Sequence, residues 1–582
     1  MWFFIKNKRS QCVLAALLFL YFAACRGQGF RASAPGTYLQ IVTSRYPLDS
    51  RLVPKATRTA LDTPSCQAVR GSNGDLWQAT AHGLVELDTK TGKEKLLTGK
   101  DGLPILTVTG LSIGSNGQLW LATREGAILY RSNAAPDQRW FYLWGKRYLA
   151  DNDVRQIVAT DDGAWIRTKT GITRFKFERY TLYRKSELFA ERIRRRHTRY
   201  GYVASCTLLQ AGDVNSFRME SADNDGLWTS IFVAAEILRY RVTHSAQALQ
   251  NARTSLRAML RLVAITGIYG MPARSLIHRG DYLPPDGEWH WTSDGQWAWK
   301  GDTSADELVG HFLAYWMAYR FLPDNEDRIK IRAAVSSIAD GLIEHQLNML
   351  GYNGKVTTWG RYGPAYLKTV VSRERALDSL ELLSHIHVAY EITGDSKFIE
   401  AYRHIGYDLG YFQNIMYFNH DLRPDEVNYS DEELAFLSFY PLINSEKNPA
   451  LHRQFVTALT NLWKSVQEEN NPLWNFIYAE GTRSQAYGCQ QGMETLERIP
   501  LSTISWTVNN SQRADLVQKS VRGRKDELQA TTAIPPDQHF VMKWNDNPFE
   551  MDGDDGGRSE DDGSFFLLPY WFARFYHLDE CH

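Results

Sequence analysis

The stretch of this sequence richest in residues that can do chemistry runs from Glu288 to His311. Tryptophans alternate there with acids and bases. The faces of tryptophan rings stack on the C–H faces of sugar rings, while nearby carboxylates bind hydroxyl groups. We therefore expect a sugar site here, with Trp291, Trp297 and Trp299 as stacking platforms. The side chains of interest are Glu288, Trp289, His290, Trp291, Trp297, Trp299, Lys300, Asp302, Asp306 and Glu307.

Part of this stretch has a structural explanation. Thr303 or Ser304 can cap the helix that follows, and Asp306 or Glu307 would complete a capping box. Capping explains neither Asp302 nor the tryptophans. Glu307 and His311 are four residues apart on a predicted helix, so a Glu–His dyad or half of a divalent-metal site is one interpretation. A packed structural histidine is the other.

A second group, Asp223-Asn224-Asp225, stands directly before a predicted helix. Capping needs only one of these side chains, so Asp225 is also a candidate to face a ligand. Hydrolysis of a glycosidic bond needs two carboxyl groups, one on either side of the bond. We expect Asp302 and Asp225 to form that pair. The carboxyls held in reserve are Glu288, Asp306 and Asp555.

Two further acidic stretches are weaker candidates. In Asn428–Glu433, Ser430 or Asp431 is the expected helix cap, and the following glutamates favour the helix dipole. The loop 552–563 is rich in acids and glycine, and Asp552, Asp554 and Asp555 could bind Ca²⁺ through hard oxygen ligands. Its spacing is not that of an EF-hand, and a solvated acidic loop is the alternative.

Two other functions remain open. A polysaccharide lyase would use a Tyr or His as base and an Arg or Asn to neutralise a uronate. The candidates are His290, Tyr362, Arg361 and Asn224. If the sugar is acidic, Arg361 or Arg558 would bind its uronate or sulfate. The third possibility is a carbohydrate-binding or sensory surface protein without catalysis.

The composition excludes some partners and reactions. The chain has 66 basic and 66 acidic residues, so it lacks the positive field that nucleic acids need. It contains no phosphate-binding glycine loop, nucleophile elbow or zinc-protease helix. Nucleotide chemistry, ester hydrolysis and metalloproteolysis are therefore disfavoured, and no cofactor is expected apart from the calcium considered above.

The elements that must position these residues are helical from about residue 181 onward. Apolar residues recur there with helical spacing, in hairpins separated by short turns. The sequence predicts an all-helical ring of five to seven helix pairs with long loops at 267–304, 351–372 and 478–562. The predicted helices are 225–241, 246–265, 306–321, 324–350, 373–392, 396–412, 431–440, 451–469 and 564–578.

One phrase within this region, His387–Tyr402, resembles a helix-turn-helix that is common in α/α-toroid glycosidases, epimerases and polysaccharide lyases. Gly394 suits a left-handed helix end, and Asp395 or Ser396 suits the next helix cap. The resemblance implies the α/α toroid fold and says nothing of the reaction. As a whole, residues 181–582 resemble an uncharacterised family of exported toroid proteins.

Three segments between about 60 and 177 repeat one pattern, in which an Asn-Gly or Asp-Gly turn opens a strand that carries a tryptophan. The tryptophans Trp77, Trp120 and Trp165 are 43 and 45 residues apart, a blade-length period. The pattern resembles the propeller repeats of two-component-regulator sensor proteins. Three blades are too few to close a propeller, so their open edges need cover.

The N-terminus reads as a secretory signal. Lys6, Lys8 and Arg9 precede the short apolar stretch 13–24, and Cys25 offers a lipidation site. The protein is therefore expected to be exported: secreted, periplasmic or lipid-anchored. Predicted boundaries are 1–25 for the signal, 26–180 for the β repeats and 181–582 for the toroid. The cysteines beyond the signal, which allow three pairings, are Cys66, Cys206, Cys489 and Cys581.

Overall fold

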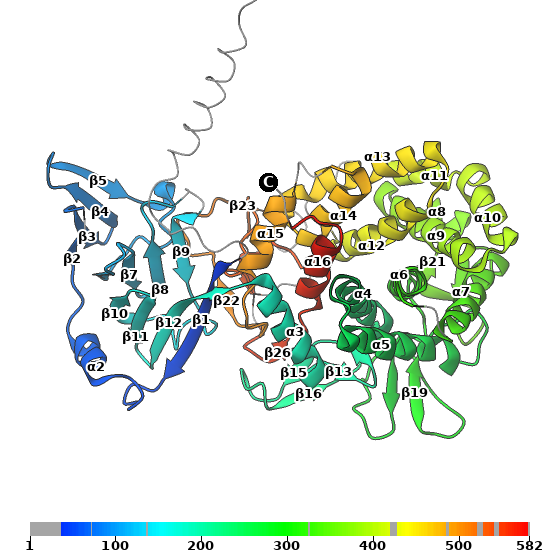
Figure 1. Cartoon of the computed structure of the whole chain (residues 1–582), viewed down its shortest axis with the longest axis horizontal. Helices are drawn as coiled ribbons and strands as arrows, with labels where there is room; N and C mark the ends of the chain where they lie inside the picture. The colour runs from blue at the N-terminus through cyan, green and yellow to red at the C-terminus, as the bar shows by residue number, and fades with distance from the viewer. Residues whose placement is uncertain are drawn as a thin grey trace, which may run out of the picture. The chain divides into compact units, whose positions relative to one another are not determined.

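The computed structural model describes most of the chain beyond residue 36. The predicted signal segment, Asp554 and Cys581 lie outside the described residues. Two compact units are present, and each is described by itself: a β unit, 37–144 with 148–181 and 513–515, and a helical unit formed by the rest (Figure 1). The described ranges are 37–71, 73–134, 138–323, 326–418, 428–484, 488–520, 528–540, 546–553 and 555–579.

The β unit consists, in its described residues, of three four-stranded antiparallel sheets. Each contains one of the hairpins predicted from the repeats, which confirms that part of the prediction. The first sheet is β2 (Ala68–Arg70), β3 (Leu76–Thr80), β4 (Gly83–Asp88) and β5 (Lys93–Leu97). The second is β6 (Gly110–Ile113), β7 (Leu119–Thr123), β8 (Gly126–Tyr130) and β9 (Trp140–Leu143). The third is ordered β1 (Tyr38–Tyr46), β12 (Ile172–Tyr180), β11 (Gly163–Thr168) and β10 (Val154–Thr160).

Repeated tryptophans form the core between these sheets. Trp77 of β3 packs edge-on against Tyr130 of β8, and Trp120 of β7 packs edge-on against Phe175 of β12. Both tryptophans are buried. The outer strand of the third sheet was not predicted: β1 pairs with β12 along all nine of its residues. The repeat pattern gave no sign of β1, because this strand carries no Trp and no Gly turn.

The helical unit is a ring of inner helices surrounded by outer ones. Within the described residues, six helices are buried on nearly every side, and consecutive ones pack together until α16 closes the ring against α4 and α14. This is the predicted α/α toroid, with helix pairs alternating outer and inner along the chain. The inner helices are α4 (Asp225–Thr243), α6 (Ala305–Phe321), α9 (Ser372–Thr393), α12 (Tyr429–Ser445), α14 (Pro472–Thr482) and α16 (Ser564–Phe575).

The outer helices carry polar residues on one side and apolar residues on the other. The predicted cap residues were correct at one hairpin: Gly394 ends α9 with φ of 72°, and Asp395 caps α10 by accepting from the backbone N–H of Lys397. The outer helices are α3 (Leu182–Arg196), α5 (Ala246–Ile265), α7 (Asp327–Glu344), α10 (Ser396–Arg403), α13 (Pro449–Val466) and α15 (Cys489–Arg498).

Three of these helices, α3, α14 and α15, were not among the predicted ones. Helix α14 is buried all round and therefore shows no amphipathic period. Helix α15 is short and lies inside the predicted loop 478–562. Sequence periodicity is a weak guide for such segments.

The first turns of the inner helices lie at one end of the ring. The backbone N–H of Gly226, at the start of α4, donates to Glu307 at the start of α6. At the starts of α9 and α12, Arg373 donates to Glu432 over 2.7 Å. We call this end the N-terminal rim. It is where the long loops meet and where the polar residues gather.

Two strand groups extend from the rim. One sheet is ordered β17 (Leu276–His278), β19 (Trp297–Lys300) and β18 (Trp289–Trp291), and the hairpin β20 (Asn348–Leu350) with β21 (Val356–Arg361) lies beside it. The ring of His290 packs 4.2 Å from that of Tyr352 and so joins the two groups.

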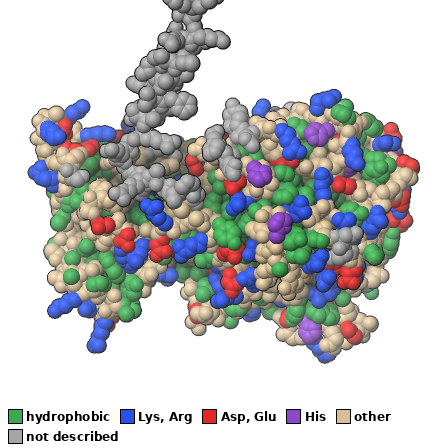
Figure 2. Space-filling view, in the orientation of Figure 1, with side chains coloured by type: hydrophobic (Ala, Val, Ile, Leu, Met, Phe, Trp, Pro, Cys, Tyr) green, Lys and Arg blue, Asp and Glu red, His purple; other side chains and the backbone are tan. Residues whose placement is uncertain are grey.

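On the face of the protein shown in Figure 2, Lys and Arg are interspersed with Asp and Glu. This agrees with the zero net charge of the sequence. No helix among the described residues is both long and apolar enough to cross a membrane.

Candidate functional site

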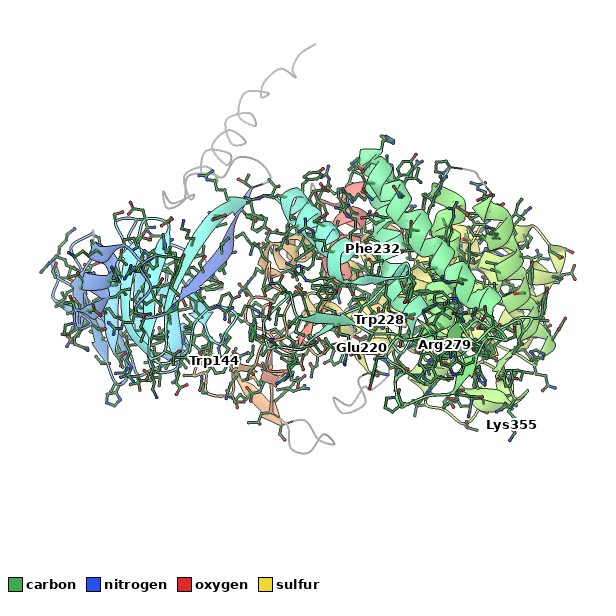
Figure 3. All side chains as sticks on the ribbon, turned by 90° about the horizontal axis from the view of Figure 1, so that it is seen from below. Trp144, Glu220, Trp228, Phe232, Arg279 and Lys355 are labelled. Atoms are coloured by element: carbon green, nitrogen blue, oxygen red, sulfur yellow. The ribbon has the colours of Figure 1, made fainter. Side chains whose placement is uncertain are left out.

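An open polar pocket of about 460 Å³ lies at the N-terminal rim of the helical unit. Its walls come from the segment before α4, the loop before β18, the end of β19 and the β20–β21 hairpin, whose tip carries Lys355 (Figure 3). The lining residues are Asp223, Arg274, Asp286, Gly287, Glu288, Lys300, Gly301, Asp302, Asn353, Lys355, Val356 and Thr358.

Asp302 is the pocket carboxylate with the most freedom to react. Its Oδ1 accepts a 2.7 Å hydrogen bond from the backbone N–H of Thr358. Its Oδ2 has no protein partner among the described residues. The backbone φ of Asp302 is 52°, a left-handed conformation that is uncommon for a residue with a side chain and that gathers at functional sites.

The other carboxylates that line the pocket are already paired. Asp223 accepts from Arg274 over 2.7 Å and also from Lys300. Asp286 accepts from Lys300 over 3.2 Å, and Glu288 lies 3.0 Å from Nε2 of His290. Asp302 is therefore the carboxylate in the described pocket lining that no Lys, Arg or His side chain contacts.

Two nearly buried cations form the floor of this network. The side chains of Lys300 and Arg274 are 6% and 9% exposed. Gly287 lets the preceding loop pass close over Lys300, since it has φ of 86° and a Cβ there would lie 2.1 Å from the lysine Cε. Burial of two cations is stable because Asp223 and Asp286 compensate their charge.

Asp225 does not share this pocket, although it does lie at the same rim as Asp302. It is fully buried. Its Oδ2 accepts from Arg199 over 2.9 Å and from the backbone N–H of Leu276, and its Oδ1 accepts from Ala222. These bonds occupy the carboxylate, so the expected Asp302–Asp225 pair is corrected: Asp225 is a structural anchor between α4, β13 (Thr198–Arg199) and β17.

Two of the three tryptophans predicted as stacking platforms pack within the small sheet instead. Trp299 is 3% exposed and packs against His290, while Trp297 is held between Tyr200 and His278 with Arg261 over its ring. Trp291, at 50% exposure, is the one of the three with an open face. The alternation of tryptophans is thus explained chiefly by the core of a small sheet.

Asp306 lies in the first turn of α6, four residues after Asp302. Burial raises its pKa above the usual value, Arg274 opposes this, and Asp223 adds to it. Two residues that line the pocket therefore influence the pKa of Asp306, although Asp306 is not itself among the lining residues. The predicted cap is confirmed at Ser304, whose hydroxyl accepts from the backbone N–H of Glu307.

Glu307 and His311 are closed off from solvent. Both are fully buried between α4 and α6, and Nδ1 of His311 lies 2.9 Å from the hydroxyl of Tyr315. Burial raises the pKa of Glu307 well above its usual range and lowers that of His311 to about 3. Burial thus disfavours the charged form of each side chain, and the arrangement fits a packed structural network better than half of a metal site.

The remaining predicted binding residues lie apart from the pocket lining. Asn224 is buried and accepts from Arg274 and Ser304. Arg361 donates to the backbone carbonyl of Thr357 and lies over the ring of Tyr366. Arg558 is exposed, and its backbone bonds to Asp555 and Leu208. The structure thus brings Asp302, Glu288 and His290 together, whereas the predicted sugar-binding arginines Arg361 and Arg558 lie elsewhere.

The acidic loop does not assemble a calcium site from its described residues. Asp552 accepts from Asn510 and Ser511, and Asp555 accepts from Ser559. No group of three metal-ligating side chains that includes them is found in the described part of the chain. Because Asp554 lies outside that part, calcium binding stays a prediction.

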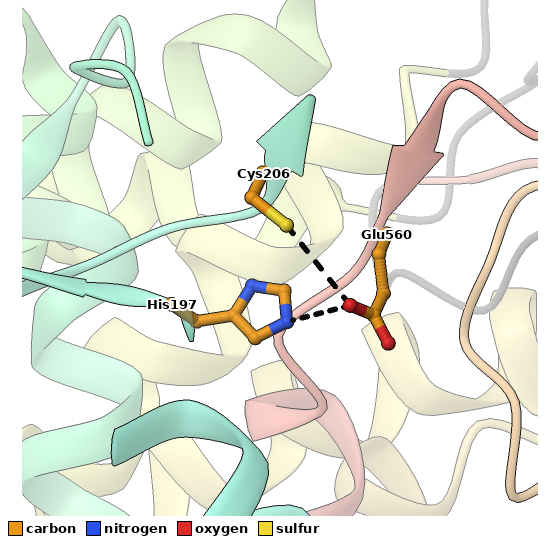
Figure 4. A group of neighbouring side chains, drawn as sticks. All are labelled: His197, Cys206 and Glu560. Atoms are coloured by element: carbon orange, nitrogen blue, oxygen red, sulfur yellow. Dashed lines mark hydrogen bonds and ion pairs between the residues drawn. The ribbon is translucent and has the colours of Figure 1, made fainter. Parts of the chain in front are cut away.

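One trio of described side chains does have metal-ligand spacing: His197, Cys206 and Glu560 (Figure 4). Glu560 is already held by Arg196 over 2.6 Å and faces Arg192 at 3.6 Å. Burial opposes ionisation of Glu560, yet its bonds to Arg196 and His197 lower its pKa to about 2. Burial, and then Glu560, raise the pKa of Cys206 to about 12.

A neutral thiol beside two arginines is a poor ligand for a cation. The trio instead joins β26 (Ser559–Glu560) to α3 and β15 (Cys206–Leu208). Cys206 is a buried free thiol and Cys66 an exposed one.

Sequence reasoning missed the polar groups at the centre of the ring. Asp378 and Glu381 lie on α9 and are buried, and Asp431 lies in the first turn of α12. Asp431 had been interpreted as a helix cap, but Asn428 is the residue that caps α12. The sequence did contain an indication of this group, since buried acids at helical spacing in an otherwise apolar segment need a partner or a function.

No family model matches this chain, and no curated protein matches it. A sugar epimerase from a ruminal bacterium is 10% identical over 67% of this chain and 97% of its own, with a TM-score of 0.39. A family 76 glycoside hydrolase from a bovine Bacteroides thetaiotaomicron strain is 9% identical over 81% and 99%, with a TM-score of 0.38.

The extracellular domain of a hybrid two-component system from B. thetaiotaomicron is 23% identical over 21% of this chain, with a TM-score of 0.17. This chain spans 17% of that one. These solved structures are of the kinds that the sequence motifs indicated. Their TM-scores are low, so they decide nothing about activity.

Proposed function

We propose that this protein is an exported enzyme that hydrolyses glycosidic bonds of an oligo- or polysaccharide at the rim pocket. The observation that carries the proposal is the state of the pocket carboxylates: Asp302 is open, Asp223 and Asp286 are paired with buried cations, and Glu288 contacts the imidazole of His290. Asp302 would act as the base or nucleophile.

Asp306 is the candidate proton donor. A general acid must hold its proton near neutral pH, and burial raises the pKa of Asp306 in that direction. Glycoside hydrolysis needs two carboxyls with different environments, and Asp302 and Asp306 at one rim are our candidates for them. Trp291 and Tyr352 offer exposed aromatic faces near the pocket for sugar rings.

The lyase alternative has less support. Its base would be Tyr362 or His290, but Tyr362 is fully buried, and burial followed by the charges of Glu381 and Asp378 raises its pKa well above 10. The arginine proposed to neutralise a uronate, Arg361, does not line the pocket. An unpaired carboxylate could also accept hydrogen bonds from sugar hydroxyls in a binding or sensory protein, so turnover is what separates that alternative from a hydrolase.

The test is Asp302→Asn in the full chain, assayed against a panel of polysaccharides for new reducing ends and for the absorbance of unsaturated uronates. We expect turnover to fall about 100-fold or more, because the amide keeps the shape but cannot transfer a proton. Melting temperature and sugar binding should be unchanged. The matched control is Asp408→Asn, an exposed carboxylate on an outer segment.

Three results would contradict the proposal. Full activity in Asp302→Asn would remove Asp302 from the chemistry. Unsaturated products would show a lyase. Sugar binding by the wild-type protein without any turnover across the panel would favour a binding protein.

A further inference from the structure

One face of α9 presents buried polar side chains to the centre of the helical ring. Asp378, Glu381 and His385 are three and four residues apart and therefore share a helix face. Glu381 and His385 are at most 1% exposed, and Asp378 is 9% exposed. Tyr362, which is fully buried, lies beside them, with its ring 6.1 Å from that of His385.

These side chains are unusual because they have few hydrogen-bond partners. Asp378 Oδ2 and both ring nitrogens of His385 have none among the described residues, and Glu381 and the hydroxyl of Tyr362 have none outside their own pair. A buried polar group without a partner is costly, so proteins rarely retain several together without a function. Two of the four residues are not acidic, so the feature is more than a cluster of carboxylates.

Asp306 links this group electrostatically to the rim pocket. The charges of Arg274 and Asp223 in the pocket lining act on Asp306, and the charge of Asp306 acts on Glu381 and on Tyr362. Asp431 of α12 acts on Glu381 as well. Side chains from α6, α9 and α12 are therefore close enough to influence one another's ionisation.

We propose that Asp378, Glu381, His385 and Tyr362 form the inner binding site for one uncharged sugar unit, whose hydroxyl groups pair with these side chains. This deepens the proposed function and rests on it, because it assigns the substrate class. The site would exclude uronates and sulfated sugars.

The chemistry of the site favours a neutral ligand. Burial raises the pKa of Asp378 to about 8, with further contributions from Glu374 and Asp431, and raises that of Glu381 well above its usual range. Burial lowers the pKa of His385 to about 3. Burial thus disfavours the charged forms of these groups, which offer both donors and acceptors, and this suits alcohols. No lysine or arginine is among the four side chains, so none of them would compensate the charge of a bound carboxylate.

The first experiment uses the wild-type full chain at pH 7. Melting temperatures are measured with glucose, galactose, mannose or N-acetylglucosamine, and in parallel with glucuronate or galacturonate. Ligands that bind only the folded state raise the melting temperature. We expect at least one neutral sugar to raise it and neither uronate to do so. A shift with uronates alone, or with no sugar at all, would overturn the proposal.

The second experiment separates a neutral from a charged role for Glu381. Glu381→Gln keeps the shape of the protonated side chain and should retain the rise in melting temperature with neutral sugars. Glu381→Leu should weaken sugar binding about tenfold or more and so lose that rise. Glu191→Gln, on the outer surface of α3, is the control. If Glu381→Leu does not fold, Glu381→Gln still decides: loss of neutral-sugar binding in this variant would contradict an uncharged site.

These results are distinguishable from failure of the proposed function. Neutral-sugar binding without turnover would leave this site standing and remove the hydrolase. Turnover of acidic polysaccharides alone, abolished in Asp302→Asn, would leave the hydrolase standing and remove this site.

Discussion

At the scale of single residues, neighbouring carboxyls in this protein differ because their partners differ. Asp223 and Asp286 are ionised partners of buried cations, Asp225 is held by Arg199, and Asp302 keeps one oxygen open at the pocket. Asp378 has no cation beside it and is surrounded by other acids. Charge compensation, more than position in the sequence, decides which of these groups can transfer a proton.

The raised pKa of Asp378 predicts a measurable effect of pH on stability. Its folded-state pKa of about 8 lies far above its unfolded value, so between these values the folded state binds more protons. The stabilising contribution is complete at low pH and is lost as the pH rises through about 8. Asp378→Asn should therefore stabilise the helical unit at pH 8 by several kcal/mol, since each unit of pKa difference corresponds to about 1.4 kcal/mol.

Scanning calorimetry of the wild type and of this variant at pH 3 and pH 8 measures the effect. At pH 3 the two proteins should melt at nearly the same temperature, since Asp378 is then protonated in both the folded and the unfolded wild type. An equal shift at both pH values would mean that the charge of Asp378 is not the cause.

At the scale of elements, buried ion pairs join strands and loops to the helical ring. Arg199 of β13 bonds to Asp225 of α4 and to the carbonyl of Leu276 in β17, so that one pair connects three elements. A similar ion pair, between Arg196 of α3 and Glu560, connects that helix to β26. Such pairs add little net stability when complete, but breaking one leaves an uncompensated buried charge.

The pair at Asp225 predicts a large loss of stability on substitution. Asp225→Ala removes the nearer carboxylate of the buried Arg199, whose other carboxylate, Asp281, lies 3.8 Å away. We expect a cost of about 3–5 kcal/mol in chemical denaturation of the helical unit. Asp408→Ala, which removes an exposed carboxylate on an outer segment, should cost far less. Similar losses for the two variants would contradict a structural role specific to Asp225.

At the scale of the whole molecule, the β unit uses residues from distant parts of the chain. Its third sheet is completed by β1, which precedes the repeats, and the segment 513–515 belongs to the same unit, where Ala514 donates to the carbonyl of Pro104. The repeats alone therefore do not define the unit. An all-β arrangement of three sheets also leaves strand edges that need cover.

Because the β unit needs residues outside the repeats, we expect residues 30–177 expressed alone to aggregate or stay unfolded. The fragment lacks segment 513–515 and contains three sheets where closed propellers have at least four. Size-exclusion chromatography and thermal melting of the fragment, beside the full chain, provide the measurement. A soluble monomer with a cooperative melt would refute the prediction.

The sequence by itself determined the class of each region. The Trp–Gly repeat predicted the hairpins, because strand alternation and turn residues are local properties. Helical spacing and the Gly394–Asp395 phrase predicted the toroid for the same reason. Helix α14 and strand β1 were not predicted, because a helix buried all round has no polar face and β1 lies outside the repeats and carries no tryptophan.

The tertiary structure alone decided which candidate residues share a site. Asp302 and Glu288 reach one pocket, whereas Asp225 and Asn224, equally close in the sequence to a helix start, are buried in structural bonds. Trp299 alternates with polar residues in the sequence, yet it packs in the sheet core. Burial and pairing depend on residues far apart in the chain, such as Arg199 with Asp225 and Asp378 with Asp431. Local sequence therefore predicts the elements, while the reactivity of each side chain follows from its neighbours in space.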